Sequence, residues 1–243
     1  MIFKDIECGF YRERKPLQYA STHEEISRVC EELGIVARAA YNMDLGTDRN
    51  AVTRATVRGA AFGEYPVYHL HAPAFSQECF SRDEMERCIR EERALFRIQP
   101  KADTTPFVSW MYGWTLELLA ETRTPLLVKL SETDFRDIGE VKSRFPELRL
   151  VFTDIGQAAN REIVRAMDSF PHVYASTSTL IGYHLLEVMV EKFGAENLLF
   201  GSNMPLKEPY DQMFYVTYAE LSEEEKQLIA YGNFERLVER RDG

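Results

Sequence analysis

The sequence predicts one (β/α)8 TIM barrel over residues 1–243, with parallel strands inside and helices outside. Three observations lead to this fold class. Short apolar segments alternate with amphipathic segments eight times along the chain. Each apolar segment is followed by small or polar residues, as expected where a buried strand ends. Neither a GxGxxG pattern nor a GxxxxGK pattern followed by serine or threonine is present, so the closed barrel is favoured over an open nucleotide-binding sheet.

Capping residues and glycine mark the helix boundaries in the first half of the chain. Ser21 with Glu24 has the capping-box spacing, and the helix that follows is expected to stop at Gly34. Ser81 with Glu84 has the same spacing. The expected strands cover residues 2–6, 35–41, 67–71 and 95–98, and the helices cover 21–34, 50–61 and 81–92.

In the second half, proline and glycine separate the elements more clearly. The run Leu198 to Phe200 is continuously apolar, which is typical of a strand buried on both faces, and Gly201 to Pro205 prevents its continuation. The expected strands cover residues 125–130, 148–153, 172–175 and 198–200. The expected helices cover residues 114–122, 135–145, 158–170, 183–193, 210–220 and 222–240.

The composition argues against several classes of protein. A formal net charge of −10 argues against binding to nucleic acid phosphates. No apolar run has the length of a membrane span, and the first residues lack the apolar stretch of a signal peptide, so we expect a cytoplasmic protein without membrane contact. The cysteines have neither CxxC spacing nor disulfide density, and we expect reduced core residues at Cys8, Cys30, Cys79 and Cys88.

Functional side chains of a parallel barrel lie where its strands end. The fourth strand contributes Arg97 and Gln99, which are candidates to bind a substrate carboxylate, because a guanidinium forms paired hydrogen bonds with one. Pairing of Arg97 with carboxylates of the barrel itself is the alternative. Trp110, with Tyr112 and Trp114, is a candidate pocket wall, although aromatic residues more often cover a core.

The histidines provide little support for a metal site. His69 and His71 share one face of an expected strand, but this is the third strand, and the other histidines do not lie at strand ends. We therefore expect a structural or substrate-contacting role, with His71 as the contact. The run 176–178 has no histidine partner close in pattern, which argues against a serine nucleophile.

Six segments in the second half carry a family resemblance. They are PLLV (125–128), FPELRLVF (145–152), VYASTS (173–178), LLFGS (198–202), LSEEE (221–225) and GNFERL (232–237). From about Phe107 to Leu237 the chain resembles the amidohydrolase-related family of metal-dependent hydrolases and decarboxylases. In the first half the similarity is confined mainly to FRIQP (96–100).

The resemblance implies a metal held by two histidines after the first strand, one after the fifth, one after the sixth, and an aspartate after the eighth. In this sequence the corresponding positions hold Glu7, Gly9, Lys129, Asp154 and Asn203. An ammonium has no lone pair for a metal, and an asparagine is a poor proton acceptor. We therefore expect neither a metal nor another cofactor at this centre.

Instead of a metal, the Lys129 ammonium is expected to occupy the centre. We hypothesise that the ammonium lies between Glu7 and Asp154 and donates a hydrogen bond to the amide oxygen of Asn203. A charge at a packed barrel mouth needs such partners. A structural cluster of ion pairs is the alternative to a catalytic one.

Two functions are compatible with this centre. One is a divergent hydrolase, decarboxylase or lyase acting on a small anionic molecule. It would use Lys129 as electrophile or Schiff-base amine, with Asp154 or Glu7 as the acid–base group. The flanking carboxylates oppose the lowered lysine pKa that such an amine requires. The other is a catalytically silent barrel that binds a small molecule or a partner protein. Apolar surface on the outer helices is compatible with a homodimer, which the sequence does not establish.

Overall fold

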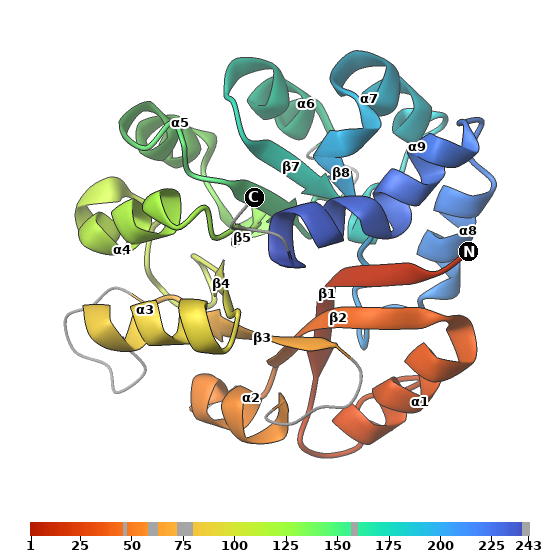
Figure 1. The fold of residues 1–243 in the computed structure, drawn as a ribbon, viewed down its shortest axis with the longest axis horizontal. Helices are drawn as coiled ribbons and strands as arrows, with labels where there is room; N and C mark the ends of the chain where they lie inside the picture. The colour runs from red at the N-terminus through yellow and green to blue at the C-terminus, as the bar shows by residue number, and fades with distance from the viewer. Residues whose placement is uncertain (46–47, 58–62, 72–79, 157–159, 240–243) are drawn as a thin grey trace.

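The computed structural model describes residues 1–45, 48–57, 63–71, 80–156 and 160–239. Its strands pair in parallel and in chain order, from β1 to β8, which confirms the predicted barrel (Figure 1). The strands are β1 (Phe3–Phe10), β2 (Ile35–Asn42), β3 (Glu64–His69), β4 (Leu95–Ile98), β5 (Leu126–Lys129), β6 (Leu150–Thr153), β7 (Val173–Ser176) and β8 (Leu198–Leu199).

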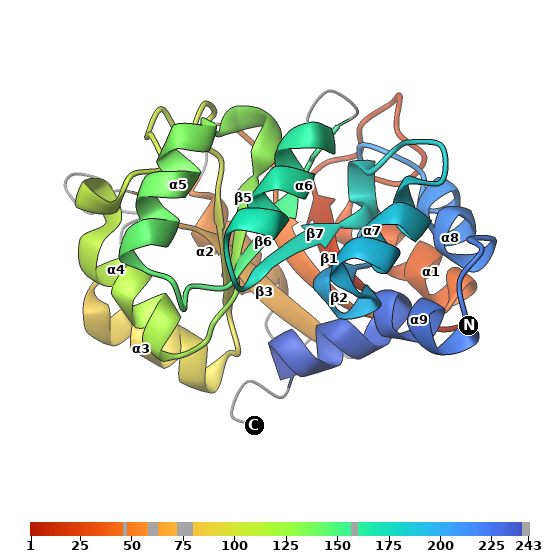
Figure 2. The same ribbon diagram turned by 90° about the horizontal axis from the view of Figure 1, so that it is seen from above.

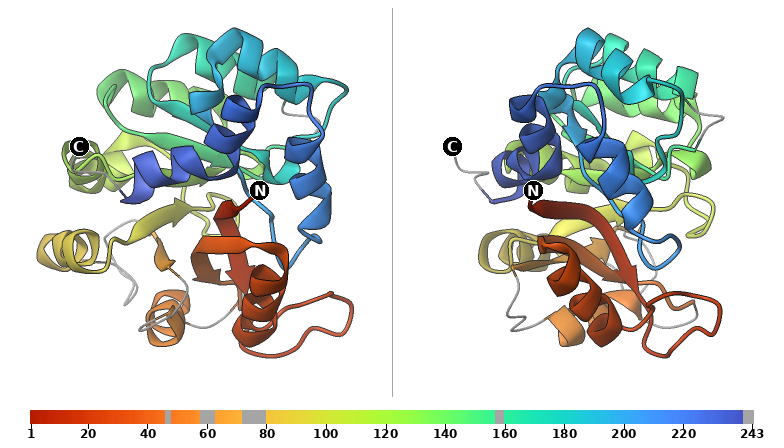
Figure 3. Two further views of the ribbon diagram at one scale, coloured as in Figure 1. Left: turned by 45° about the vertical axis from the view of Figure 1, so that its right-hand side comes forward. Right: turned by 90° about the vertical axis from the view of Figure 1, so that its right-hand side faces the viewer.

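Helices alternate with the strands and lie outside them, as Figures 2 and 3 show. They are α1 (His23–Leu33), α2 (Arg49–Val57), α3 (Arg82–Glu91), α4 (Ser109–Glu121), α5 (Phe135–Arg144), α6 (Asn160–Ser169), α7 (Leu185–Phe193), α8 (Tyr210–Thr217) and α9 (Glu223–Gln227). Short helical segments are η1 (Leu130–Glu132), η3 (Thr177–Thr179), η4 (Ala195–Asn197), η5 (Leu228–Gly232) and η6 (Glu235–Glu239). Within the described residues, every helix is too short or too polar to cross a lipid bilayer.

Backbone hydrogen bonds close the barrel between its first and last strands. The amide of Ile6 donates to the carbonyl of Phe200 at 3.0 Å, and the amide of Gly9 donates to Met204 at 2.7 Å. Strand β8 is short, so the chain after it completes the pairing with β1. The segment from Leu198 onward therefore belongs to the barrel wall, and the residues that follow the strand lie beside β1.

Two apolar layers account for the core. The interior layer takes side chains from all eight strands: Ile6, Ala37, Ala39, Tyr41, Val67, Leu95, Leu127, Val151, Tyr174 and Leu199. The second layer lies between strands and helices. Alternation along each strand explains this division, because successive side chains point to opposite faces.

The C-terminal segment closes the amino-terminal end of the barrel. Phe234, Leu237 and Val238 join the interior cluster. At the start of β1, the Lys4 ammonium lies 3.0 Å from a carboxylate oxygen of Glu235. Figure 1 shows this blue segment lying across the barrel, and Figure 2 shows it beneath the strands. With this end covered, the opposite end remains for a ligand.

Several boundaries differ from the sequence expectation. The first helix is capped by Thr22 with Glu25, one residue later than predicted. The reason is that the Ser21 hydroxyl accepts the amide of Lys15 at 2.8 Å, so it holds the preceding loop instead. The cap of α3 by Ser81 with Glu84 is confirmed.

The observed ends of two strands and the start of one helix also differ from the prediction. Strand β1 continues to Phe10, so Glu7 and Gly9 lie within it rather than after it. Strand β3 ends at His69, which leaves His71 beyond the strand. Helix α4 begins at Ser109, five residues before the predicted start, with non-helical backbone at Gly113. Predicted helix ends at 58–61, 158–159 and 240, and also Cys79, lie outside the described residues.

Candidate active site

A cavity of about 430 Å³ lies at the carboxyl ends of strands β1 to β4. This is the end of a parallel barrel at which ligands bind, because the loops after the strands meet there. Its lining residues are Tyr11, Lys15, Met43, Asp44, Leu45, Arg49, His69 and Gln99. The cavity therefore combines apolar side chains with two cationic ones.

A buried ion pair lies at the mouth of the barrel. Arg97 Nη1 donates to Glu7 Oε1 at 3.0 Å, and both side chains are almost completely buried. The Ser178 hydroxyl donates to the second carboxylate oxygen of Glu7. The Arg97 guanidinium also lies over the Tyr41 ring, 4.5 Å from its centre. Removing both charges from water is energetically unfavourable, so the ion pair is needed to hold them in the buried site.

A register irregularity in β1 includes Glu7. Pairing between β1 and β2 shifts between Asp5 and Cys8, and the Glu7 amide donates to the Asp5 carboxylate at 2.9 Å. Gly201 lets the end of β8 approach closely. A Cβ there would lie 2.2 Å from Ser176 Oγ and 3.5 Å from Glu7 Cβ.

Lys129 belongs to a second, more exposed cluster. Its ammonium lies 2.8 Å from Glu132 Oε1 and 3.4 Å from Asp154 Oδ2. The Ser131 hydroxyl donates to the same Asp154 oxygen at 2.7 Å. Burial lowers the pKa of Lys129, but the hydrogen bond and charge of Glu132, with the charge of Asp154, outweigh it and raise that pKa.

These contacts correct the hypothesis of a central lysine. Asp154 is close to Lys129, as we expected, but the cation bonded to Glu7 is Arg97. The raised pKa of Lys129 also opposes its use as a Schiff-base amine, because the nucleophile is the neutral form.

Asn203 lies at the seam between β8 and β1. The backbone amide of Asn203 donates to the backbone carbonyl of Glu7 at 3.1 Å, and the residue is largely buried. Its backbone has a φ of 57°, and Asp154 has a φ of 47°. Asparagine and aspartate tolerate this left-handed conformation better than most residues. Both therefore suit sharp turns directly after strands.

The residues at the family's metal positions do not fit a divalent ion. Both carboxylate oxygens of Glu7 have partners, and Lys129 supplies only donors. Gly9 has no side chain, and Met43 fills the adjacent space, with its sulfur 2.2 Å from where a Cβ would be. Among the described residues, no three histidine, cysteine, aspartate or glutamate side chains are grouped to hold a metal.

His69 is the site residue that sequence reasoning undervalued. It ends β3 and lines the cavity, although its exposed fraction is only 1%. The Asn50 side chain fixes its backbone, accepting the His69 amide at 2.7 Å and donating to its carbonyl at 3.2 Å. The His69 ring packs edge-on against Tyr41 and is stacked with His71. The sequence did carry one sign of this role. His69 lies two residues after Val67, so both side chains point to the inner face of the barrel.

The His69 ring is neutral, and the hydrogen-bonding capacity of its nitrogens is poorly satisfied among the described residues. Burial lowers its pKa well below the usual range, and the charges of Arg49, Arg97 and His71 lower it further, against a small opposing effect of the Asn42 carbonyl. Within the described part of the chain, neither ring nitrogen has a partner with good hydrogen-bond geometry. The same holds for Arg97 Nε and Thr153 Oγ1. Buried polar atoms without partners indicate a place for a ligand or water.

Two cations of the cavity wall were not predicted. Arg49 forms an ion pair with Asp103, and the Asp103 carboxylate also accepts the backbone amide of Gln99 at 3.3 Å. Lys15 lies 3.6 Å from Asp44 and 4.7 Å from the centre of the Tyr11 ring. Both residues could have been predicted from their positions, since they lie in segments that follow strands.

Not every predicted residue joins this site. Gln99 lines the cavity, and His71 stacks on His69. Trp110 lies on the first turn of α4 with 75% of its surface exposed, and Tyr112 is buried against the core. Nothing in the described contacts connects Trp110 with the cavity. His172 precedes β7, at the opposite end of the barrel, as expected.

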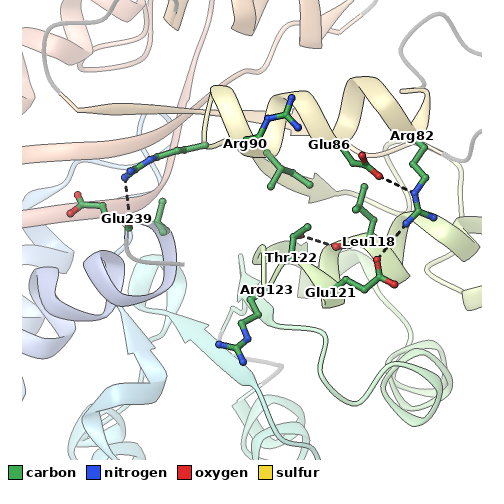
Figure 4. Close-up of a pocket in the computed structure, with 11 residues that line it drawn as sticks. Arg82, Glu86, Arg90, Leu118, Glu121, Thr122, Arg123 and Glu239 are labelled. Atoms are coloured by element: carbon green, nitrogen blue, oxygen red, sulfur yellow. Dashed lines mark hydrogen bonds and ion pairs between the residues drawn. The ribbon is translucent and has the colours of Figure 1, made fainter. Parts of the chain in front are cut away.

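A larger cavity of about 710 Å³ lies at the amino-terminal end, between α3, α4 and η6 (Figure 4). Arg82 of α3 forms an ion pair with Glu121 of α4 at 3.4 Å and another with Glu86 of its own helix at 3.0 Å. The Arg93 guanidinium donates to the Glu239 carbonyl at 3.0 Å. This end of a barrel stabilises the fold, so the smaller cavity is the better candidate for a site.

Comparisons with known proteins agree with this architecture. An uncharacterized TIM-barrel protein from Bordetella bronchiseptica is similar, with a TM-score of 0.79, 16% identity and full coverage of both chains. A 2,6-dihydroxybenzoate decarboxylase from Rhizobium has a TM-score of 0.75, 13% identity and full coverage of both chains. A 4-oxalomesaconate hydratase from Rhodopseudomonas palustris has a TM-score of 0.71 and 17% identity, covering 99% of this chain and 97% of the other.

At the level of sequence, no curated protein matches the chain. The family model described as amidohydrolase (Amidohydro_2) matches residues 20–240, which is most of the chain. The protein is therefore a member of the amidohydrolase family.

Proposed function

We propose that this protein is a divergent hydrolase or lyase, decarboxylases included, that acts on a small anionic molecule without the metal of its family. The observation that carries this proposal is His69. It is buried, uncharged and without well-placed partners at either ring nitrogen among the described residues, and it faces a cavity of about 430 Å³. A neutral imidazole in such a place is suited to accept or donate a proton.

The charges around His69 support an anionic ligand. Arg49 and Arg97 both lower the pKa of His69, so the electrostatic potential at the ring is positive. The same potential stabilises a carboxylate placed against the ring. The volume is within the range for small-molecule sites, about 300 to 1,000 Å³.

Structural neighbours suggest a class of substrate to test. They include decarboxylases named for 2,6-dihydroxybenzoate and for 5-carboxyvanillate, at 12% and 12% identity. These are small aromatic carboxylates, and the cavity wall here offers Tyr11, Met43 and Leu45 beside its cations. We therefore propose aromatic carboxylic acids as the first substrates to examine.

In this proposal Lys129 stays charged. Its raised pKa makes the ammonium a fixed hydrogen-bond donor that stabilises negative charge, rather than a nucleophile. Asp154, beside it, is the partly exposed acid–base group. Glu7 holds Arg97 in place and does not exchange protons with the substrate.

A catalytically silent barrel is the second candidate, and a specific observation favours it. Cations at the mouth are paired with carboxylates: Arg97 with Glu7, Arg49 with Asp103, Lys129 with Glu132 and Asp154, and Lys15 with Asp44. Such a network stabilises the mouth without any chemistry. Binding without turnover would then be the outcome.

Turnover by chelator-treated protein distinguishes the two. Hydroxybenzoates, lactones and amides are incubated with wild type and with His69→Gln, and product is followed by chromatography. We expect turnover that falls by about 10²-fold or more in His69→Gln. His172→Gln, a histidine change at the opposite end, is the matched control and should keep full activity. Ligand binding without turnover in wild type would support the silent barrel, and equal activity of both variants would remove His69 from the mechanism.

A further inference from the structure

Two cysteines lie together behind the active site, between β1 and α1. Cys8 follows Glu7 in β1, and Cys30 lies in the third turn of α1. Their exposed fractions are 1% and 6%, and both belong to the layer between strands and helices. The two thiols are close enough for each to shift the pKa of the other. The amidohydrolase chemistry proposed above uses neither sulfur.

Arg38 of β2 is positioned against the Cys30 sulfur. Its Nη1 donates to Cys30 Sγ at 3.5 Å. The rest of the guanidinium is fixed, because Nη2 donates to Ser27 Oγ at 2.8 Å and Nε donates to Glu64 at 2.8 Å. A guanidinium held beside a sulfur favours the thiolate, which is the reactive form of cysteine.

The environment separates the roles of the two sulfurs. The neighbouring Cys8 thiol lowers the pKa of Cys30, and the charge of Arg38 lowers it further, which together outweigh burial. The neighbouring Cys30 sulfur and burial raise the pKa of Cys8. Of the two sulfurs, Cys30 therefore loses its proton more readily, and Cys8 keeps its proton.

A narrow crevice between described residues reaches Cys30. The crevice has a volume of about 10 Å³ and is lined by Ser27, Cys30, Ile35, Ala37, Arg38 and Glu64. This is room for roughly one water-sized molecule. Hydrogen peroxide has one heavy atom more than water, so the crevice must widen slightly to admit it, whereas bulky thiol reagents need a much larger opening. Cys8 does not line the crevice.

We infer that Cys8 and Cys30 form a peroxide-oxidisable pair, in which Cys30 reacts first and Cys8 then closes an intramolecular disulfide. The Cys30 thiolate attacks one oxygen of hydrogen peroxide, the O–O bond breaks, and Cys30 sulfenic acid and hydroxide form. The Cys8 sulfur then attacks the Cys30 sulfur, and the S–O bond breaks. Hydroxide leaves and is protonated, in part by the proton of Cys8. Overall, two thiols are oxidised to one disulfide while one peroxide is reduced to two waters.

The test uses a Cys79→Ser/Cys88→Ser background, in which only these two thiols remain. The folded protein is treated with hydrogen peroxide, quenched with an alkylating reagent and digested, and its peptides are mapped by mass spectrometry. We expect a Cys8–Cys30 linked peptide that dithiothreitol removes. With Cys8→Ser added, dimedone should label Cys30. With Cys30→Ser added, Cys8 should stay unlabelled.

Two outcomes would overturn the inference. One is the absence of the linked peptide while both thiols remain alkylatable after peroxide treatment. The other is faster labelling of Cys8 in Cys30→Ser than of Cys30 in Cys8→Ser. Should either serine variant fail to fold, as judged by circular dichroism, the peptide map of wild type still decides. There, peroxide must link Cys8 to Cys30 before Cys88 is oxidised.

Discussion

Two charged clusters at the mouth of the barrel differ in burial. The Arg97–Glu7 pair is sealed, with side-chain exposures of 3% and 0%. The Lys129 cluster is open, with exposures of 25% for Lys129, 13% for Glu132 and 29% for Asp154. Glu7 in the first cluster, and Lys129 and Asp154 in the second, occupy positions at which the family resemblance implies metal ligands. Burial therefore divides the charged groups of the mouth into a sealed structural unit and a solvent-accessible unit.

Burial determines how the two clusters respond to mutation. A buried pair that loses one partner leaves an uncompensated charge, whereas an exposed pair is screened by water. The predictions that follow test this division, from the largest expected effect to the smallest.

Arg97→Met should give the largest loss of stability. It leaves the Glu7 carboxylate buried with Ser178 as its remaining partner, and we expect the free energy of unfolding to fall by about 3 to 5 kcal/mol. Urea unfolding at pH 7 measures it. The double variant Glu7→Gln/Arg97→Met should recover part of that loss, because no charge is then buried. A loss below that of Lys129→Met would contradict the division.

Gly201→Ala should also destabilise the protein. The added Cβ would lie 2.2 Å from Ser176 Oγ and 3.2 Å from Ser178 Cβ, so the end of β8 or these serines must move. We expect a cost of about 1 to 3 kcal/mol in urea unfolding. Gly139→Ala is the matched control, since the nearest atom there is 3.9 Å away. Equal stability of the two variants would show that the mouth tolerates movement.

Asp5 and His69 should give opposite pH dependences. Burial raises the pKa of Asp5 to about 7, against the hydrogen bonds of Ser202 and Glu7. Its folded pKa is raised, so stability is fully present below the unfolded value of about 3.9 and is lost as the pH rises toward 7. Relative to Asp5→Asn, wild type should lose stability over that window. A parallel pH profile of the two proteins would contradict the raised pKa.

For His69 the sign is reversed. Its folded pKa is depressed, so stability is fully present above the unfolded value of about 6.5 and falls as the pH drops below it. The slope has a limit of about 1.4 kcal/mol per pH unit. Urea unfolding at pH 7 and pH 5 should show a larger drop for wild type than for His69→Gln, and an equal drop would contradict a neutral buried ring.

Lys129→Met should have the smallest effect on stability. Its ion pairs are partly exposed, and such pairs contribute about 0 to 1 kcal/mol. The effect should shrink further at high salt, because salt screens exposed charges. Unfolding in low and high sodium chloride measures both. A loss as large as that of Arg97→Met would place Lys129 in the structural unit.

The fold followed from the sequence because each strand and helix carries its own local pattern. Continuous apolar runs such as 198–200 mark buried strands, and Gly34 ends α1 in the left-handed conformation that glycine permits. The cap of α1 was misplaced by one residue because Ser21 and Thr22 are both good caps, and the contact of Ser21 with Lys15 decides between them.

The site was predicted less well because it depends on contacts distant in sequence. The partner of Glu7 is Arg97, and this pairing requires the strand register and the irregularity in β1, neither of which leaves a local pattern. His69 seemed unremarkable for the same reason. Its importance comes from the absence of good partners among the described residues, which only the packed structure shows.

Metal content tests the central claim most directly. Protein produced in medium supplemented with zinc and manganese, and purified without chelator, is analysed by inductively coupled plasma mass spectrometry. The account predicts no stoichiometric metal, because Arg97, Ser178 and Lys129 already satisfy the carboxylates of the mouth. One zinc or manganese per chain in wild type, lost in Glu7→Gln or Asp154→Asn, would contradict it.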